Sequence, residues 1–211
     1  MFTTTQASGY YAAPVTKLLI GSITLLSLLA SIYRLQPYAV LSFDPHLIRD
    51  FQLYRLATSQ LIVTSSYELF LVGLLLHELR GVERMLGAAK YASIVFTVMV
   101  VFAPLLQVGF LAGIWYWNQS NQDCAIKVNG LPPGSIVLLT ALIVIRCSIL
   151  PVAYRFRVFG VVFSERIFMY LLLAQLVILR APLTIVQLSS GVMVGVMYSY
   201  NMLYMKRWIF P

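Results

Sequence analysis

A serine at the start of a long apolar run has the setting of a nucleophile held at a membrane surface. Ser135 follows two prolines and a glycine, and the apolar run that it opens continues to Leu150. A serine hydroxyl becomes a nucleophile only when a base within hydrogen-bond reach takes its proton. Two interpretations follow: Ser135 is a nucleophile, or it caps the start of a helix.

Candidate bases for this serine are scarce. His46 lies in a polar segment, and no histidine follows His77. A position about 11 residues into a helix lies about 16 Å deep, so His77 is remote from Ser135 at the membrane surface. We therefore expect Ser135 to be an N-cap or first-turn residue whose hydroxyl satisfies backbone amides that lipid cannot satisfy.

Charged residues follow His77, namely Glu78, Arg80, Glu83 and Arg84. An acid–base or metal site stays open as an interpretation, but no further histidine, cysteine or carboxylate has ligand spacing with this group. The simpler interpretation is a membrane helix that emerges into the cytosol with its charges solvated or paired along one face. We expect no metal, no cofactor and no catalytic residue.

The composition is that of a membrane protein. Of the 211 residues, 60% are hydrophobic and 10% are charged, whereas a soluble domain is about 45–50% apolar and about 25% charged. The net charge of +8 comes from basic residues scattered between apolar runs. That pattern is typical of membrane orientation and not of nucleic-acid binding. We expect one all-α transmembrane domain over residues 1–211.

Six apolar segments are candidates to cross the roughly 30 Å hydrocarbon core as helices. They cover about residues 16–33, 66–79, 91–117, 134–150, 165–179 and 183–204. The polar segment 44–63 has apolar residues at near-helical spacing, which predicts an interfacial amphipathic helix. With the N-terminus in the cytosol, ten of the fifteen lysines and arginines fall on the cytosolic side and five on the lumenal side, so both termini are predicted to be cytosolic.

Two motifs resemble those of rhomboids and derlins. Residues 51–58 resemble the Trp-Arg motif of their first loop, with Tyr54 in the tryptophan position and Arg55 as the arginine. Gly191 and Gly195 resemble the glycine pair of the sixth rhomboid helix. Glycines four residues apart share one helix face, so another helix backbone can approach there closely.

A third motif follows the second apolar segment. Glu83, Arg84 and Gly87, together with the Lys-Tyr pair that follows, resemble the rhomboid and derlin signature at this place. The resemblance covers about residues 16–204. It implies a six-transmembrane-helix rhomboid-like bundle with an interfacial first loop, in which Arg55 and the Glu83-Arg84 pair fix the loop and the cytosolic helix end.

The same resemblance answers the question about the serine. An active rhomboid has a G-x-S-G motif at the start of its fourth helix and a histidine three residues before the first glycine of its sixth helix. Here Pro133 occupies the nucleophile position, Gly134 follows it, and Leu188 occupies the histidine position. The chain therefore resembles a rhomboid pseudoprotease and is expected not to be an enzyme. Gly134 is expected, like the sixth-helix glycines, to allow close helix approach.

Residues 8–17 and 131–134 resemble the rhomboid-like proteins that carry a C-terminal ubiquitin-associated domain. In animals that group acts in endoplasmic-reticulum-associated degradation, and in fungi it belongs to the Dsc membrane ubiquitin-ligase complex of Golgi and endosomes. We expect no ubiquitin-associated domain in this chain, because the sequence stops at Pro211 shortly after the sixth segment.

The resemblance implies a catalytically inactive scaffold of a membrane ubiquitin-ligase complex in the endoplasmic reticulum, Golgi or endosomes. Such a scaffold recognises transmembrane clients for ubiquitin-dependent degradation. Its expected partners are membrane lipid, ligase subunits, a segregase adaptor and the clients, and nucleic acid is not among them. The alternatives are a derlin-like retrotranslocation component, an active intramembrane serine protease and a channel.

Overall fold

The computed structural model describes residues 13–34, 54–120, 131–151, 155–158, 161–181 and 183–202. The elements in chain order are α1 (Pro14–Ile32), α3 (Tyr54–Leu61), α4 (Ser66–Leu86), α5 (Ala88–Thr97), the π-helical turn η2 (Val98–Phe102), α6 (Ala103–Ser120), α7 (Ile136–Ile149), β1 (Arg155–Val158), β2 (Val161–Ser164), α8 (Arg166–Ile178) and α9 (Leu183–Ser199). A helix lies at each of the six apolar segments, so the expectation of a helical bundle is confirmed.

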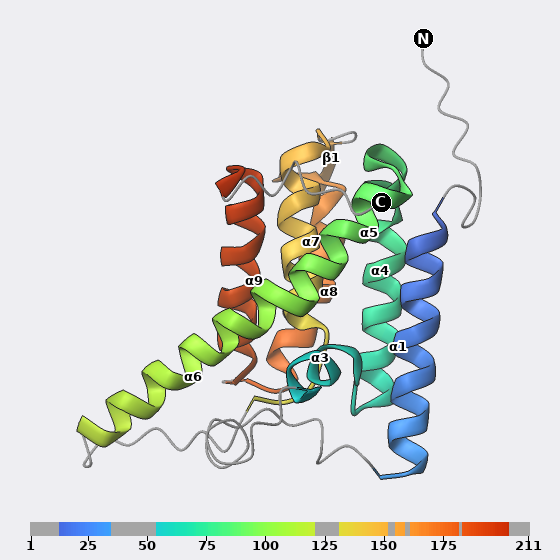
Figure 1. Cartoon of the computed structure of the whole chain (residues 1–211). Coiled ribbons are helices and arrows are strands. Elements are labelled where there is room, and N and C mark those ends of the chain that lie inside the picture. Colours follow the sequence, from blue (N-terminus) through green and yellow to red (C-terminus); the bar gives the residue numbers. More distant parts are fainter. Residues whose placement is uncertain are drawn as a thin grey trace.

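Helix α7 forms the centre of this bundle (Figure 1). Every residue from Ile136 to Ile143 is buried, and so is Ile145. A helix that is hydrophobic on all sides is stable only when other elements surround it. Helices α4, α8 and α9 pack against α7, so the fourth apolar segment of the sequence becomes the core of the fold.

The bundle has two ends, which Figure 1 shows at the bottom and the top. Helix α3 lies at the end where α4 and α7 begin, and we call this the α3 end. Strand β1 and the junction of α4 with α5 lie at the opposite end, the hairpin end. Within the described residues, a helix is present over Tyr54–Leu61 of the predicted interfacial segment, and residues 44–53 lie outside the described residues.

The third apolar segment forms one long helix with a π-helical turn in it. At η2 the backbone N–H of Ala103 donates to the carbonyl of Val98, five residues back. The next residue is Pro104, whose ring removes a backbone donor and disturbs the regular ladder. Beyond this point α6 runs obliquely away from the other helices (Figure 1), with Leu105 and Tyr116 largely exposed.

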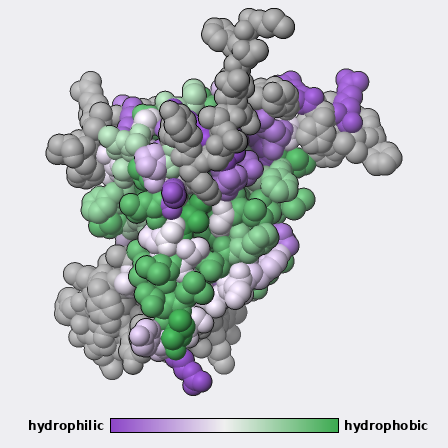
Figure 2. All heavy atoms as spheres, turned by 90° about the vertical axis from the view of Figure 1, so that its right-hand side faces the viewer, coloured by the Kyte–Doolittle hydropathy of each residue, from purple (hydrophilic) through white to green (hydrophobic). Residues whose placement is uncertain are grey.

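Two helices in the described part of the chain are long and apolar enough to cross a membrane, Pro14–Ile32 and Ala88–Trp117. Helices α7, α8 and α9 are apolar but shorter. The positions of the predicted helices are therefore confirmed, while the count of six membrane spans stays a prediction. Figure 2 shows apolar residues over the middle of the α1 face and hydrophilic residues gathered at the hairpin end.

One element was not predicted, the antiparallel hairpin of β1 and β2 between α7 and α8. Arg155 pairs with Ser164 and Arg157 pairs with Val162. Its strands hold four residues each, which is too short for period-2 alternation to stand out from a polar loop. Both strands contain valine and phenylalanine, which favour extended backbone, and in β1 these residues alternate with arginine.

Candidate functional site

Ser135 is fully buried at the α3 end, and its hydroxyl is bonded to backbone. The Oγ atom donates to the carbonyl of Gln60 in α3 at 2.8 Å. The preceding N–H, of Gly134, donates to the carbonyl of Ser59 at 2.8 Å. Ser135 is the N-cap residue of α7 as expected, but its side chain makes no capping bond to the helix. Its hydroxyl instead ties the start of α7 to α3.

No histidine lines the cavity beside this serine. Pro133 and Ser135 line it together with Glu68, near the start of α4. His77 lies on α4 nine residues after Glu68, which corresponds to about 14 Å of helix rise. Leu188 is partly buried and does not line the cavity. The described residues therefore bring no histidine to Ser135, whose hydroxyl is bonded to the Gln60 carbonyl.

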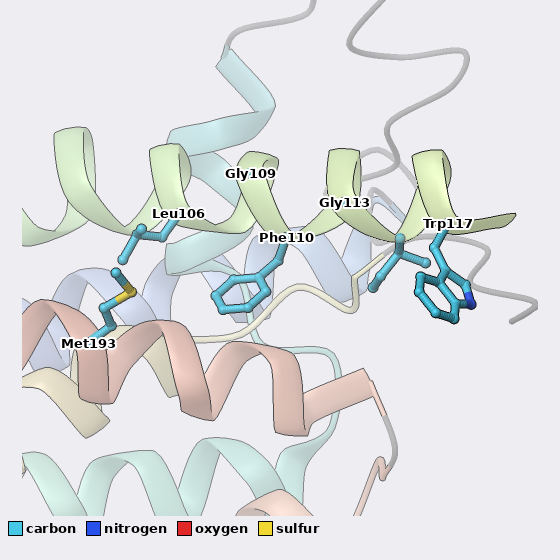
Figure 3. Close-up of a pocket in the computed structure, with 7 residues that line it drawn as sticks. Leu106, Gly109, Phe110, Gly113, Trp117 and Met193 are labelled. Atoms are coloured by element: carbon cyan, nitrogen blue, oxygen red, sulfur yellow. The ribbon is translucent and has the colours of Figure 1, made fainter. Parts of the chain in front are cut away.

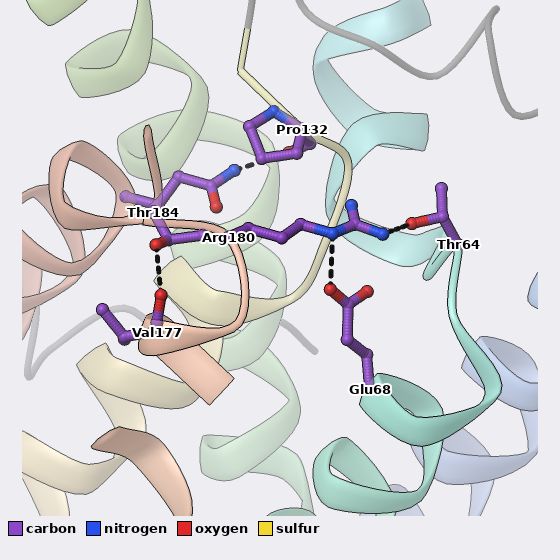
Figure 4. Close-up of polar contacts among 7 residues, drawn as sticks. Thr64, Glu68, Pro132, Val177, Arg180 and Thr184 are labelled. Atoms are coloured by element: carbon purple, nitrogen blue, oxygen red, sulfur yellow. Dashed lines mark hydrogen bonds and ion pairs between the residues drawn. The ribbon is translucent and has the colours of Figure 1, made fainter. Parts of the chain in front are cut away.

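A set of polar contacts surrounds this cavity, and we call it the polar junction (Figure 4). It consists of Thr64, Glu68, Pro132, Val177, Arg180, Thr184 and Gln187. The Arg180 Nε atom lies 2.6 Å from Glu68 Oε1, and the same guanidinium donates to the Thr64 hydroxyl. Gln187 Nε2 donates to the carbonyl of Pro132 at 2.7 Å.

The ion pair of this junction joins distant parts of the chain. Glu68 lies in the first turn of α4, and Arg180 lies in the short connection between α8 and α9. The Glu68 side chain is only 8% exposed, whereas that of Arg180 is 28% exposed. We did not single out either residue from the sequence. The sequence offered one clue: Glu68 and Arg180 carry opposite charges and are both expected at the same membrane surface.

The junction leaves room for about one water molecule. The free volume at its centre is ≈ 10 Å³, which is close to the minimum that a water needs. The side-chain oxygen of Gln187 accepts no hydrogen bond from the described residues, so a water at the centre would satisfy it. A peptide segment cannot enter without separating the helices.

Further buried hydrogen bonds fasten α3 to its neighbours. Gln60 Nε2 donates to Gln107 Oε1 of α6 at 2.7 Å, and both side chains are almost fully buried. The backbone N–H of Val63 donates to the hydroxyl of Ser27 in α1 at 3.0 Å. The first loop is therefore bonded to α1, α6 and α7. Tyr54 and Arg55 belong to α3, but their side chains lie outside the described residues.

Glu83 acts at the hairpin end, where it caps α1. Its carboxylate is fully buried and accepts three hydrogen bonds, from the N–H of Val15 at 2.8 Å, the N–H of Thr16 at 2.7 Å and the Thr16 hydroxyl at 2.6 Å. The first N–H groups of a helix have no intrahelical acceptor, and a negative charge there is favourable. Arg84 is partly buried beside it, and Gly87 turns the chain from α4 into α5 at φ +86°, a conformation suited to glycine.

The two glycines of α9 lie against α7. A Cβ added at Gly191 would come within 2.7 Å of Thr140 Cβ and of the Val137 carbonyl oxygen. A Cβ added at Gly195 would come within 2.6 Å of Val144 Cβ. The structure thus places these glycines where two helices approach closely. Gly134 differs from the expectation, because an added Cβ there would meet nothing within 4 Å.

An apolar groove lies between α6 and α9 (Figure 3). Its volume is ≈ 480 Å³, and it is lined by Leu106, Gly109, Phe110, Gly113, Ile114, Trp117 and Met193. Gly109 and Gly113 share one helix face, and a Cβ added at either would meet nothing within 4 Å. This glycine pair therefore has no helix against it in the described structure, in contrast to the pair on α9.

Comparison with known proteins identifies relatives of the chain. It is 25% identical over 200 residues to "DSC E3 ubiquitin ligase complex subunit 2" of Schizosaccharomyces pombe, covering 93% of this chain and 51% of that protein. It is 29% identical over 204 residues to "Ubiquitin-associated domain-containing protein 2" of Homo sapiens, covering 96% of this chain and 57% of that protein. "Rhomboid-like protein 18" of Arabidopsis thaliana is 28% identical over 204 residues, which cover 97% of this chain and 67% of that protein. No solved structure matches.

The chain spans little more than half the length of the yeast and human relatives. Residues 17–206 match the family described as "Eukaryotic integral membrane protein (DUF1751)". That match covers nearly the whole bundle, from α1 to beyond α9. The chain is therefore an integral membrane protein of the DUF1751 family, related to its rhomboid-like members from yeast, plants and animals.

Proposed function

We propose that the chain is a non-catalytic rhomboid-like scaffold of a membrane ubiquitin-ligase complex, which holds transmembrane clients for ubiquitin-dependent degradation. The name of the yeast relative, a ligase-complex subunit, supports the association with such a complex. The observation that carries the proposal is the polar junction. It occupies the α3 end of the bundle, where the resemblance to rhomboids places their reactive pair.

The hydrogen bonds in and beside this junction support a role without chemistry. Ser135 donates its hydroxyl hydrogen to a backbone carbonyl, which cannot act as a base. Pro133 has no hydroxyl, and Gln187 uses its amide to hold the Pro132 carbonyl. The free volume is too small for a peptide substrate. The contacts instead hold α3, α4, α7 and α9 in fixed relative positions.

Transmembrane clients dock in the α6–α9 groove under this proposal. Gly109 and Gly113 allow a helix backbone to approach, as Gly191 and Gly195 do for α7 within the chain. A second apolar groove, between α4 and α8, is crossed by a hydrogen bond from Gln175 to the Tyr67 hydroxyl.

Short helices support a second part of the proposed mechanism, local thinning of the bilayer. Helix α8 has 13 residues, which corresponds to about 20 Å at 1.5 Å per residue, well below the roughly 30 Å of a hydrocarbon core. Its exposed side chains include Leu171 and Ile178. A thinner bilayer beside α8 lowers the free energy needed to hold clients with short or polar spans.

The proposed setting is a membrane of the endoplasmic reticulum, Golgi or endosomes, with the hairpin end and both termini in the cytosol. Ligase subunits and a segregase adaptor are the proposed partners. The basic residues that favour this orientation include Lys17, Lys90 and Arg146 at the hairpin end. Intramembrane proteolysis, channel activity and retrotranslocation remain alternatives that no contact described above favours.

Site-specific photocrosslinking in cells tests the proposal. With a crosslinker at Phe110, we expect adducts with transmembrane clients, and we expect ligase subunits to copurify with the full chain in mild detergent. Gly109→Leu with Gly113→Leu fills the groove and should reduce client adducts by about tenfold, equivalent to about 1.4 kcal/mol. At equal levels of folded protein, Ser135→Ala should leave client turnover unchanged, because its hydroxyl takes part in no chemical step.

Gly21→Leu on α1 is the matched control, because an added Cβ at Gly21 also meets nothing within 4 Å. It should leave the adducts unchanged. Equal adducts in the groove variant and in the control would refute docking in the groove. Failure of every ligase subunit to copurify would refute the scaffold itself. Cleavage of a transmembrane substrate by the purified chain, abolished by Ser135→Ala, would refute the non-catalytic assignment.

A further inference from the structure

The β1–β2 hairpin presents two arginines on one face at the hairpin end. Arg155 and Arg157 are both exposed. Residues two apart on a strand point to the same face, about 7 Å apart along the backbone. Their strand partners, Ser164 and Val162, carry no charge. The hairpin therefore offers a compact doubly positive surface.

Other arginines at this end are used inside the fold. Arg146 donates to the carbonyl of Glu78, which joins the end of α7 to α4. Arg166 donates to the carbonyl of Leu150, so it satisfies a group at the end of α7. The side chains of Arg155 and Arg157 form no hydrogen bond or ion pair within the described residues. Their positive charges are available to a ligand.

Acidic residues at the hairpin end do not offset this charge. Glu83 is fully buried and directs both carboxylate oxygens to the start of α1. Glu78 and Glu165 are partly buried, and within the described residues neither forms an ion pair with the hairpin arginines. The surface around Arg155 and Arg157 is therefore complementary to an anion.

We propose that the hairpin binds the phosphate of anionic phospholipid headgroups through Arg155 and Arg157. Guanidinium groups match phosphate oxygens with paired, charge-assisted hydrogen bonds. The hairpin links the end of α7 to the start of α8, and both are apolar helices of an integral membrane protein. If α7 and α8 cross the membrane as the sequence predicts, this connection lies at headgroup depth, next to the lipid.

This position favours lipid over an acidic protein as the ligand. Headgroups surround the hairpin at high local concentration in any bilayer that contains anionic lipid, whereas a protein must diffuse to it. A two-stranded hairpin is also marginally stable alone in water, and contact with a charged headgroup layer would stabilise it. The proposal is independent of the ligase assignment and of the α6–α9 groove.

Native mass spectrometry of the purified full chain tests the proposal, with phosphatidylserine titrated against phosphatidylcholine. A basic residue at an anionic surface contributes about 1 kcal/mol, which is about a fivefold change in the binding constant. We expect Arg155→Gln and Arg157→Gln each to weaken phosphatidylserine binding about fivefold, and the double variant about 25-fold. Phosphatidylcholine binding should not change.

Lys17→Gln is the control, because Lys17 is also exposed and basic and lies in the first turn of α1. It should leave phosphatidylserine binding unchanged. An equal loss in Lys17→Gln would show a general charge effect and overturn the site. Unchanged binding in the double variant, at an unchanged melting temperature, would also overturn it. Displacement by equimolar inorganic phosphate would assign the arginines to a free anion, and tighter binding of polyglutamate would assign them to an acidic protein; either result excludes the lipid site.

Discussion

Glu83 and Ser135 show how complete burial fixes the role of a polar side chain. Both are fully buried, so each polar atom needs a partner inside the protein to avoid a penalty of several kcal/mol. The Ser135 hydroxyl finds the Gln60 carbonyl, and the Glu83 carboxylate finds three donors at the start of α1. Each side chain joins two elements, and its polar atoms are engaged in these structural hydrogen bonds.

Replacement of Glu83 by glutamine tests the cap. The amide keeps the shape but loses the charge and one acceptor oxygen, so at least one of the three donors loses its acceptor. Hydrogen bonds to charged groups contribute about 1.5–3 kcal/mol, and we expect Glu83→Gln to lower the free energy of unfolding by about that amount. The measurement is denaturant unfolding in detergent, followed by circular dichroism.

Glu78→Gln is the control for this prediction, since it makes the same change on the same helix at a partly buried position. It should shift the free energy of unfolding by no more than about 0.5 kcal/mol. Equal effects of the two substitutions would mean that the α1 cap contributes nothing specific.

At the scale of elements, the two glycine pairs make opposite predictions. Gly191→Ala places a Cβ 2.7 Å from the α7 backbone, and forcing atoms into a packed interface costs about 1–3 kcal/mol. Gly113→Ala meets nothing within 4 Å, and alanine in a helix is about 0.5–1 kcal/mol more favourable than glycine. Thermal unfolding in detergent should therefore show a loss for Gly191→Ala and a small gain for Gly113→Ala. If both substitutions lowered the melting temperature by similar amounts, the result would contradict the empty space beside Gly113 on α6.

Helix positions could be predicted from the sequence because apolar runs longer than ten residues have few alternatives in lipid. The predicted apolar segment ends at residue 79, and α4 continues beyond it to Leu86. That extension is stabilised by tertiary contact, since Val82 and Glu83 are buried against other elements. The resemblance singled out Glu83 and Gly87. That Glu83 caps α1 and that Gly87 has a positive φ could be learned only from the structure.

The polar junction could not be predicted, because its bonds join residues far apart in the chain. Glu68 and Arg180 come from opposite halves of the sequence, and no local pattern specifies that they meet. The same holds for Gln60 and Gln107. Periodicity reports which face of a helix is buried, but the pairing of buried polar atoms depends on how the helices are arranged.

At the scale of the whole molecule, the described helices differ in length around the bundle. Helix α1 has 19 residues, or about 28 Å, whereas α8 has 13 residues, or about 20 Å. A bilayer of uniform thickness cannot match both. The polar junction and the Glu83 cap fix the helices at the two ends, so the lipid and not the protein is expected to deform beside α8.

Bilayer thickness therefore should control stability. In nanodiscs of phosphatidylcholine with increasing acyl-chain length, we expect the melting temperature to fall as the bilayer thickens. The mismatch at α8 is roughly 10 Å against an average core, and each ångström costs a fraction of a kcal/mol, which sums to a few kcal/mol. Arg180→Gln breaks the ion pair that fixes the short α8–α9 connection to α4, so this variant should depend less steeply on thickness, because the helices can tilt to relieve the mismatch. A melting temperature that is highest in the thickest bilayer would mean that the short helices are matched by tilt or by other segments and that the chain does not thin its membrane.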